Sequence, residues 1–399
     1  MEIFKEDFRL SAYTFKDNVL CFLFAFMGLL NMRVYLLWEN YFALFYSLTF
    51  GLILFLLAFN FNKYVDFKLL KYTIIYFMIE IGALLFTKLF YPEREIIFFV
   101  FLFLSISSLF LCIGNKYKFK SLQFLLNITS FIFLFGIIEY FLIMFGLVGA
   151  SGVVSNEKDY IYYTYTFNVI PEFEVVGTFY RFCSLFNEPG VVGTFCGLVL
   201  YVLPFNSFRL YIFIFAGIIS FSLAFYVLLF MFLIFSFNLK RGLIIIGLMA
   251  LFISVFGVEI FEKHILSRVG QGDEIIDDNR TSEEFDNIYD DFVLSPNVLW
   301  GDGIGVLSEM KSVYIDACSW KRFVLERGFL GFAILLIFSI WSYCSQYGVL
   351  PLKVGLLLFA YMAALYQRAG YLYGIEYFIL LYSAPLFIGF YSDSSKLKK

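Results

Sequence analysis

No charged side chain interrupts residues 42–60, FALFYSLTFGLILFLLAFN. About 20 apolar residues in a helix are enough to cross the hydrocarbon core of a bilayer. Similar runs recur along all 399 residues, and 61% of the chain is hydrophobic against roughly 45–50% in a typical soluble domain. Charged residues make up 15%, where soluble domains have about 25%. We therefore expect an all-α, polytopic integral membrane protein.

The apolar runs predict about 12 transmembrane helices within a single polytopic membrane domain, residues 1–399. They lie near residues 18–38, 42–60, 69–90, 96–114, 121–149, 189–205, 209–220, 222–238, 242–258, 323–345, 352–366 and 371–391. The seventh and eighth runs are short, so one long helix is an alternative to two. Two long polar loops are expected at 150–188 and 259–321.

Part of the second loop has a helical pattern. From Ser282 to Phe292, the side chains of Phe285, Ile288, Tyr289 and Phe292 share one face. This stretch predicts an amphipathic helix.

Lysines set the expected orientation, because short cytoplasmic loops are rich in positive charge. With the N-terminus inside, the basic segments at 62–71, 115–120, 238–241 and 394–399 all fall on the cytoplasmic side. Both long loops then lie outside. The first residues, MEIFKEDFRLSAYTFKDN, are polar and lack a small-residue cleavage site, so no removable signal peptide is expected.

Other protein classes do not fit this composition. The apolar share excludes a soluble enzyme, and a net charge of −3 gives no electrostatic basis for binding nucleic acid. The same composition excludes a secreted disulfide scaffold, and the six cysteines are scattered, with no CxxC and no paired spacing. One histidine, His264, is too few for a His-based metal site. No metal or other cofactor is expected.

Arginine departs from the lysine pattern. The arginines expected outside or at outer helix ends are Arg33, Arg94, Arg181, Arg268, Arg280, Arg322, Arg327 and Arg368. A guanidinium binds phosphate or carboxylate through two parallel hydrogen bonds and keeps its charge when partly buried. These residues therefore indicate a polyanionic head group at the outer leaflet. The alternative is that they pair weakly with the acidic residues of the same loops.

Arg181 precedes a turn and a helix start in RFCSLFNEPG, residues 181–190. Pro189 suits a first helical position, and Asn187 or Glu188 suits the N-cap. A helix N-terminus beside an arginine favours an anion site. An ordinary capped turn is the alternative.

These stretches resemble the O-antigen polymerase and ligase superfamily of bacterial membrane glycosyltransferases. The pattern R-x-x-S-L-F-x-E-P at 181–189 is similar to its signature, and Arg280 followed by EEFDNIYDDFVLSPNVLWGDGIGV is similar to its large periplasmic loop. FVLERGFLGFAILL (323–336) and YQRAGYLYGIEYFILLY (366–382) are similar to the segments that follow. The resemblance covers roughly residues 175–385 and implies a GT-C-like glycosyltransferase fold.

The resemblance favours a polymerase over a ligase. Ligases of this superfamily carry a His about nine residues before the glutamate of the last loop motif, where this sequence has Ala317. The implied reaction joins oligosaccharide repeats carried on undecaprenyl pyrophosphate, at the periplasmic face of the inner membrane, into O-antigen or capsular polysaccharide. The implied partners are the lipid-linked donor and acceptor, membrane lipid and a chain-length regulator protein. A ligase, or a transporter or flippase of lipid-linked oligosaccharide, remains as an alternative.

The arginine pattern and the resemblance together predict site residues. Arg181 and Arg280 are expected to stabilise the leaving pyrophosphate without a metal, and Arg268, Arg322 and Arg368 to add substrate contacts. Glu188 and Asp316 are candidates for the base, with helix capping and a solvated loop carboxylate as their respective alternatives. Tyr163 and Tyr165, in IYYTYTF (161–167), are candidates to stack on sugar rings or to seat the loop at the interface. Glu139, within a predicted span, either has a functional role or pairs with another polar group.

Overall fold

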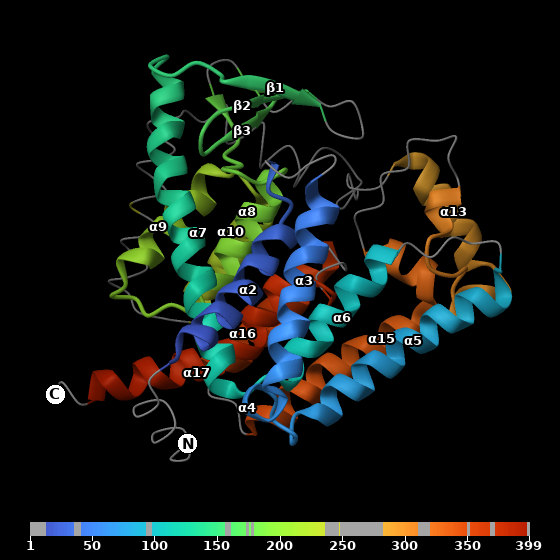
Figure 1. Cartoon of the computed structure of the whole chain (residues 1–399). Helices are drawn as coiled ribbons and strands as arrows, with labels where there is room; N and C mark the ends of the chain where they lie inside the picture. The colour runs from blue at the N-terminus through green and yellow to red at the C-terminus, as the bar shows by residue number, and fades with distance from the viewer. Residues whose placement is uncertain are drawn as a thin grey trace. The chain divides into compact units, whose positions relative to one another are not determined.

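The computed structural model describes residues 13–35, 41–92, 98–155, 161–172, 175–176, 179–235, 247, 282–309, 320–348, 352–367 and 372–396. The chain divides into two compact units. Unit 1 takes its described residues from 1–28, 45–122 and 278–389, and unit 2 from 29–44, 123–277 and 390–399. Figure 1 shows that helices dominate the described chain.

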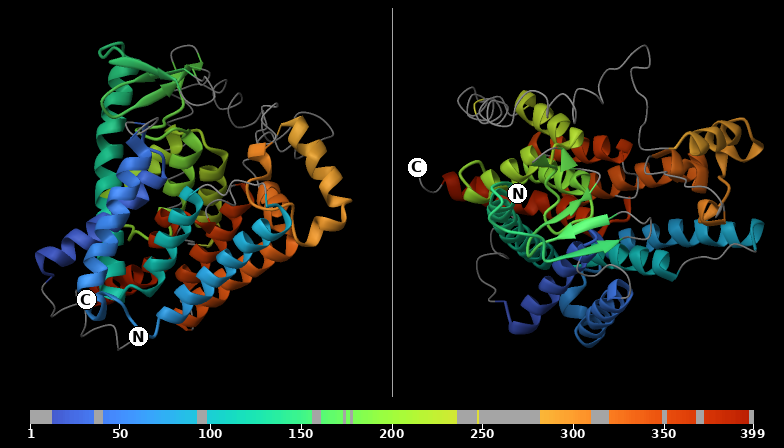
Figure 2. Two further views of the ribbon diagram at one scale, coloured as in Figure 1. Left: turned by 45° about the vertical axis from the view of Figure 1, so that its right-hand side comes forward. Right: turned by 90° about the horizontal axis from the view of Figure 1, so that it is seen from above.

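Unit 1 contains most of the long helices. Its elements are α2 (Phe15–Asn31), α3 (Tyr41–Phe59), α4 (Phe61–Tyr64), α5 (Leu70–Phe90), α6 (Phe98–Cys112), α13 (Glu283–Val293), η4 (Pro296–Leu299), α14 (Val306–Glu309), α15 (Trp320–Tyr347), α16 (Leu352–Gln367) and α17 (Ile375–Lys396), of which α2, α3 and α17 continue into unit 2. Helices α5 and α15 contact each other and run side by side in both views (Figures 1 and 2).

Every expected apolar run except 242–258 coincides with a described helix, and 242–258 lies outside the described residues. Among the described residues, four helices are long and apolar enough to cross a membrane: α3, α5, α15 and α7 (Asn115–Met144). The protein is therefore a helical membrane protein. Several other helices are apolar but shorter than the roughly 20 residues of a full span, so the number of spans stays a prediction.

In unit 2, residues 208–235 form two helices rather than one long helix. Helix α9 (Phe208–Ile219) ends before α10 (Leu223–Phe235), and Phe221 between them has a φ of 47°, which a helix does not allow. Helix α8 (Pro189–Val199) packs across this break. A Cβ on Gly193 of α8 would lie 2.2 Å from the Cβ of Ser222, so only glycine permits the approach.

The all-α expectation needs one correction in the first long loop. Strands β1 (Gly152–Ser155), β2 (Ile161–Thr164) and β3 (Val169–Pro171) form an antiparallel sheet, with Val153 opposite Tyr163 and Tyr163 opposite Ile170. Strands β4 (Val175–Val176) and β5 (Phe179–Tyr180) pair as a second, two-stranded sheet. Backbone outside the helices has to satisfy its own hydrogen bonds, and these ladders do so.

The amphipathic helix expected from Ser282 to Phe292 is confirmed as α13. The Ser282 hydroxyl accepts a hydrogen bond from the Phe285 amide at 3.2 Å, which caps the helix start. Phe285, Tyr289 and Phe292 are buried and pack with Val324 and Leu325 of α15. Burial also raises the pKa of the Tyr289 phenol to about 12. This part of the second loop is thereby fixed to the start of α15.

The contact at Gly193 predicts a measurable loss of stability. Gly193→Ala should lower the melting temperature in detergent, because the added methyl meets the Ser222 side chain and overpacking costs about 1–3 kcal/mol. Gly51→Ala on α3 is the matched control, since a Cβ there has no neighbour within 4 Å. Equal melting temperatures for the two variants would contradict the close packing of α8 on the break.

Candidate functional site

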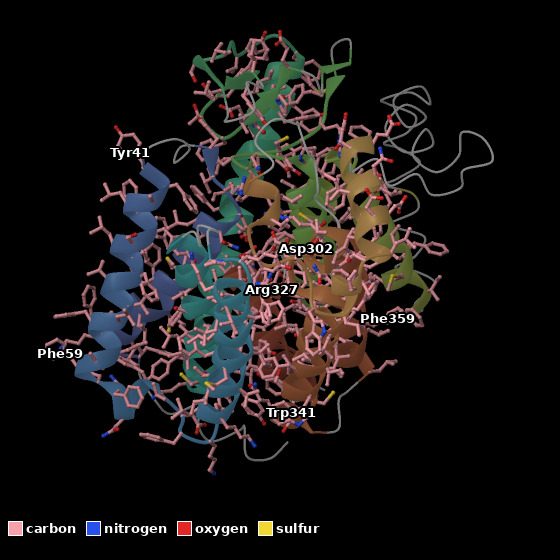
Figure 3. The ribbon with its side chains drawn as sticks, turned by 90° about the vertical axis from the view of Figure 1, so that its right-hand side faces the viewer. Tyr41, Phe59, Asp302, Arg327, Trp341 and Phe359 are labelled. Atoms are coloured by element: carbon pink, nitrogen blue, oxygen red, sulfur yellow. The ribbon has the colours of Figure 1, made fainter. Side chains whose placement is uncertain are left out.

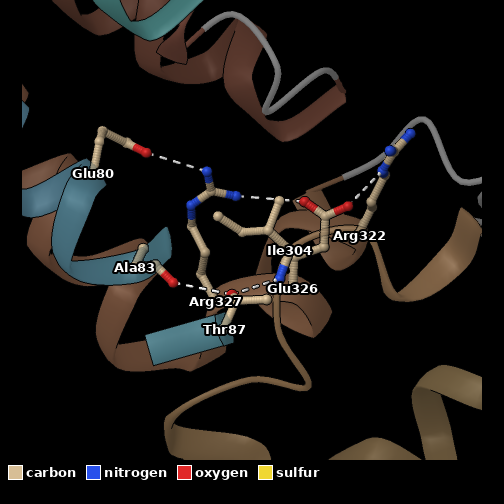
Figure 4. A network of polar contacts seen from close by, with 7 residues as sticks. All are labelled: Glu80, Ala83, Thr87, Ile304, Arg322, Glu326 and Arg327. Carbon is tan, nitrogen blue, oxygen red and sulfur yellow. Dashed lines mark hydrogen bonds and ion pairs between the residues drawn. The ribbon is translucent and has the colours of Figure 1, made fainter. Parts of the chain in front are cut away.

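A buried arginine lies between α5 and α15 in unit 1. The Arg327 side chain is 3% exposed, and its Nη2 is 3.2 Å from Oε2 of Glu80 on α5, which is 1% exposed. Its Nη1 donates to Oε2 of Glu326 at 3.4 Å (Figure 4). Two carboxylates therefore balance the positive charge of this guanidinium, which is buried away from water.

Aromatic rings complete the surroundings of Arg327. Its Cζ atom lies 4.5 Å from the ring centre of Phe323 and 4.9 Å from that of Tyr373. A guanidinium over an aromatic face is attracted by the ring electrons, most strongly where water is excluded. The backbone carbonyl of Tyr373 is itself held by the Ser107 hydroxyl. The cation is thus enclosed by charge and by π-electrons from three segments of the chain.

The ion pairs continue to a side chain that reaches solvent. Arg322 Nε lies 3.2 Å from Oε1 of Glu326, one helical turn away, and the Arg322 side chain is 52% exposed. Both oxygens of Glu326 therefore bind guanidinium groups, which leaves this carboxylate poorly suited to act as a base. The series Glu80–Arg327–Glu326–Arg322, here called the ion-pair chain, runs from a buried anion to a half-exposed cation.

A glycine turn braces the ion-pair chain. Helix α15 is kinked at Gly328, where φ is 70° and ψ is 170°, and the turn at Gly301 has a φ of 83°. A Cβ on Gly301 would lie 2.4 Å from the Gly328 amide nitrogen, so the two backbones touch. Figure 3 shows Asp302 beside Arg327. The run Gly-Asp-Gly-Ile-Gly (301–305) forms this turn, with positive φ at all three glycines.

Backbone hydrogen bonds fix the same turn on two sides. The Asp302 amide donates to the Leu325 carbonyl at 2.8 Å. The Ile304 amide donates to Oγ1 of Thr87 on α5 at 3.0 Å (Figure 4). The turn therefore ties the kinked start of α15 to the C-terminal end of α5.

Arg181 has a different setting in unit 2 from the one expected. It is buried, with Nε donating to the Ser220 carbonyl and Nη2 to the Phe221 carbonyl, each at 3.2 Å. These carbonyls belong to the break between α9 and α10, where a cation also meets the negative end of the α9 dipole. Arg181 therefore stabilises the break, and its contact with pyrophosphate stays a prediction.

Glu188 is the N-cap residue of α8 and Pro189 follows at the first helical position, as expected. The carboxylate forms no capping hydrogen bond with the first turn, so the capping alternative for its side chain is not realised. Its role as a base stays a prediction.

Tyr163 lies on the less buried face of β2, because Tyr162 and Thr164 are buried on the other, and Tyr165 follows directly after the strand. The Tyr163 hydroxyl donates to Oε1 of Glu172 at 3.2 Å, which raises its pKa. Burial and the nearby Glu139 raise the pKa of Tyr165. Both residues are half-buried, and their stacking on sugar rings stays a prediction.

Glu139 pairs with the turn of the same sheet. Its carboxylate accepts from the amides of Thr166 at 2.9 Å and Phe167 at 2.7 Å, and from the Asn168 side chain at 3.0 Å. A carboxylate that accepts several hydrogen bonds from a turn holds that turn in place. The polar-pairing alternative is therefore the one observed, and it fastens β2 and β3 to α7.

The remaining predicted site residues, Arg268, Arg280, Asp316 and Arg368, lie outside the described residues. Within the described ranges, no group of three or more His, Cys, Asp or Glu side chains is placed to hold a metal ion.

Glu326 and Arg327 are not among the site residues predicted from the sequence. The available signal was a charge beside or within an apolar span, which is costly unless it is paired or functional. Glu80 and Arg327 both have this property, but their pairing joins positions far apart in the sequence.

Comparison with known proteins identifies no relative: no family model, curated protein or solved structure matches this chain.

The ion-pair chain predicts unequal costs for its two arginines. Arg327→Met should lower stability strongly, by about 3–5 kcal/mol, because it leaves Glu80 buried and unpaired. Arg322→Met should cost under about 1 kcal/mol, because the Arg322 side chain is half-exposed and Glu326 keeps Arg327 as a partner. Melting curves in detergent measure both.

The double variant Glu80→Gln, Arg327→Met supplies the control. It should recover part of the loss, because the uncompensated buried charge is gone. Similar losses for Arg322→Met and Arg327→Met would disprove the difference in burial.

Proposed function

We propose that the protein is a membrane glycosyltransferase that polymerises oligosaccharide repeat units linked to undecaprenyl pyrophosphate, at the periplasmic face of the bacterial inner membrane. The observation that carries the proposal is the half-exposed Arg322 guanidinium, held in orientation by a carboxylate that is itself fixed by a buried arginine. The segment FVLERGFLGFAILL (323–336), which carries part of the family resemblance, begins one residue after Arg322 and contains both Glu326 and Arg327.

The chemistry requires an anion-binding group. The acceptor hydroxyl attacks the reducing-end sugar of the donor, the bond from that sugar to the diphosphate breaks, and negative charge develops on the departing lipid diphosphate. A guanidinium fixed in advance stabilises that charge more than a mobile one, because it needs no reorganisation during the reaction. Arg322 uses Nε for Glu326, and its two terminal nitrogens carry the other four N–H donors of the guanidinium.

The remaining candidate residues keep, each by itself, the roles that the resemblance implies. Arg181, Arg268, Arg280 and Arg368 add positive charge, and Glu188 and Asp316 are candidates to accept the proton of the attacking hydroxyl. Tyr163 and Tyr165 supply ring faces for sugars of the growing chain, and bound saccharide would be packed against them.

The test is a gel profile of surface polysaccharide from a deletion strain of the native host. Complementation with the wild type should restore a ladder of many repeats, whereas Arg322→Ala should leave a single repeat. Arg322→Lys should restore the ladder poorly, because an ammonium lacks the planar fork. Arg209→Ala is the matched control: this arginine binds Asn127, and it follows the sixth predicted span, on the side expected to be cytoplasmic.

The outcomes separate the alternative functions. Full-length polymer that accumulates on the lipid carrier would indicate a ligase. A ladder unchanged by the deletion would reject the polymerase and leave a transporter. A normal ladder with Arg322→Ala would reject Arg322 as the diphosphate group.

Arg181 has a separate prediction, because it has a structural role. Arg181→Gln should lower both the melting temperature and the amount of long polymer, since the Ser220 and Phe221 carbonyls lose a charged donor. Loss of polymer at an unchanged melting temperature would instead place Arg181 in contact with substrate.

A further inference from the structure

Three large apolar side chains are exposed where α13 leads into the glycine turn. Leu294 is 87% exposed, and Leu299 and Trp300 are each 55% exposed. They flank or end the short helix η4, and we call them the η4 ridge. Large apolar side chains gathered in one place mark a surface that contacts something other than water.

The η4 ridge is attached to the end of a candidate membrane span. The Trp300 ring lies 6.5 Å from that of Phe86 on α5, with an angle of 27° between their planes. The Asn297 side chain donates to the Tyr91 hydroxyl at 3.4 Å, just beyond the last residue of α5. The ridge therefore has a fixed position relative to α5.

The apolar surface continues from the ridge along α5. Leu85, Leu89 and Phe90, in the last turns of α5, are all exposed. Because α5 is long and apolar enough to cross a bilayer, these side chains face lipid. Trp300 and Leu299 extend that surface beyond the helix end, where tryptophan is enriched at membrane–water interfaces.

The acidic side chains next to the η4 ridge limit how deeply it can enter the membrane. Helix α13, next to it, exposes Glu283, Glu284, Asp290 and Asp291. These carboxylates have to stay in water, since a charge in the hydrocarbon core costs several kcal/mol. The boundary between the ridge and this acidic face therefore marks the level of the lipid head groups.

We propose that the η4 ridge is an interfacial anchor that inserts into the leaflet around the C-terminal end of α5. Its partner is the lipid surface itself. Insertion sets the depth of the second loop, and with it the height of the glycine turn and Arg322 above the acyl chains. This inference concerns lipid contact and does not depend on the reaction that the protein catalyses.

Tryptophan quenching by brominated lipids tests the anchor. The chain has four tryptophans, so a variant that keeps only Trp300 carries phenylalanine at 38, 320 and 341. It is reconstituted in phosphatidylcholine vesicles with bromine either near the carboxyl end or near the middle of the acyl chain. Trp300 fluorescence should fall in both, and more with the shallow bromine.

Two single-tryptophan variants serve as controls. Trp341 is exposed on α15, about 18 Å along the helix from Phe329. Its fluorescence should also be quenched by the brominated lipids, which makes it a positive control for lipid contact. Trp320 packs against Tyr289 and Phe332 and should lose less fluorescence than Trp300. If the triple variant does not fold, the difference in quenching between the wild type and Trp300→Phe gives the same information.

Two results would overturn the proposal. Trp300 fluorescence that responds to aqueous acrylamide but to neither brominated lipid would place the ridge in water. Fluorescence that responds to no quencher would mean that protein, such as a second copy of the chain, covers the ridge. Neither result bears on the polysaccharide ladder, so this proposal and the proposed function fail separately.

Discussion

A guanidinium enclosed between two apolar helices is the constraint on which unit 1 depends. Moving a charge out of water costs several kcal/mol even after relaxation, and the cost is offset only by well-placed opposite charge and hydrogen bonds. Arg327 obtains this from Glu80 on α5 and from Glu326 on its own helix. The pair helps to fix the register of α5 against α15, because sliding either helix along the other would separate the two buried charges.

The glycine turn is a consequence of the same requirement. For Arg327 to face α5 while the rest of α15 continues through apolar surroundings, the helix has to bend, and it bends at Gly328. The bend opens space that the Gly301 backbone fills at a distance no side chain would tolerate. From there Thr87 accepts the Ile304 amide, so the loop is attached to the span that also carries Glu80. Arg322 is thus presented on a braced scaffold.

Local patterns in the sequence were sufficient for some of these features and not for others. Apolar runs located the helices, and the spacing of Phe285, Tyr289 and Phe292 after a serine cap located α13, because both signals depend only on neighbours in the chain. The first-loop sheet was missed although Ile161–Thr164 alternates in burial, since tyrosine on both faces hides the alternation from a polarity pattern. The partners of Arg181 and Arg327 were not predictable, because they lie 39–40 and 247 residues away along the chain.

Charged side chains in the two units are used in different ways, and the difference bears on which arginine meets substrate. In unit 2, Glu139 accepts from turn amides and Arg181 donates to carbonyls at a helix break, so each charge satisfies irregular backbone that has little access to water. In unit 1 the charges pair with one another, and the series ends in a guanidinium that solvent reaches.

An anionic head group that bound at Arg181 would compete with the backbone carbonyls there, and loss of those contacts would loosen the α9–α10 break. If the proposed diphosphate binds at Arg322 instead, the terminal nitrogens are the donors and the pairs of Glu326 and Arg327 stay in place. The energetic cost of binding is therefore lower at Arg322, which favours it as the first contact for a diphosphate.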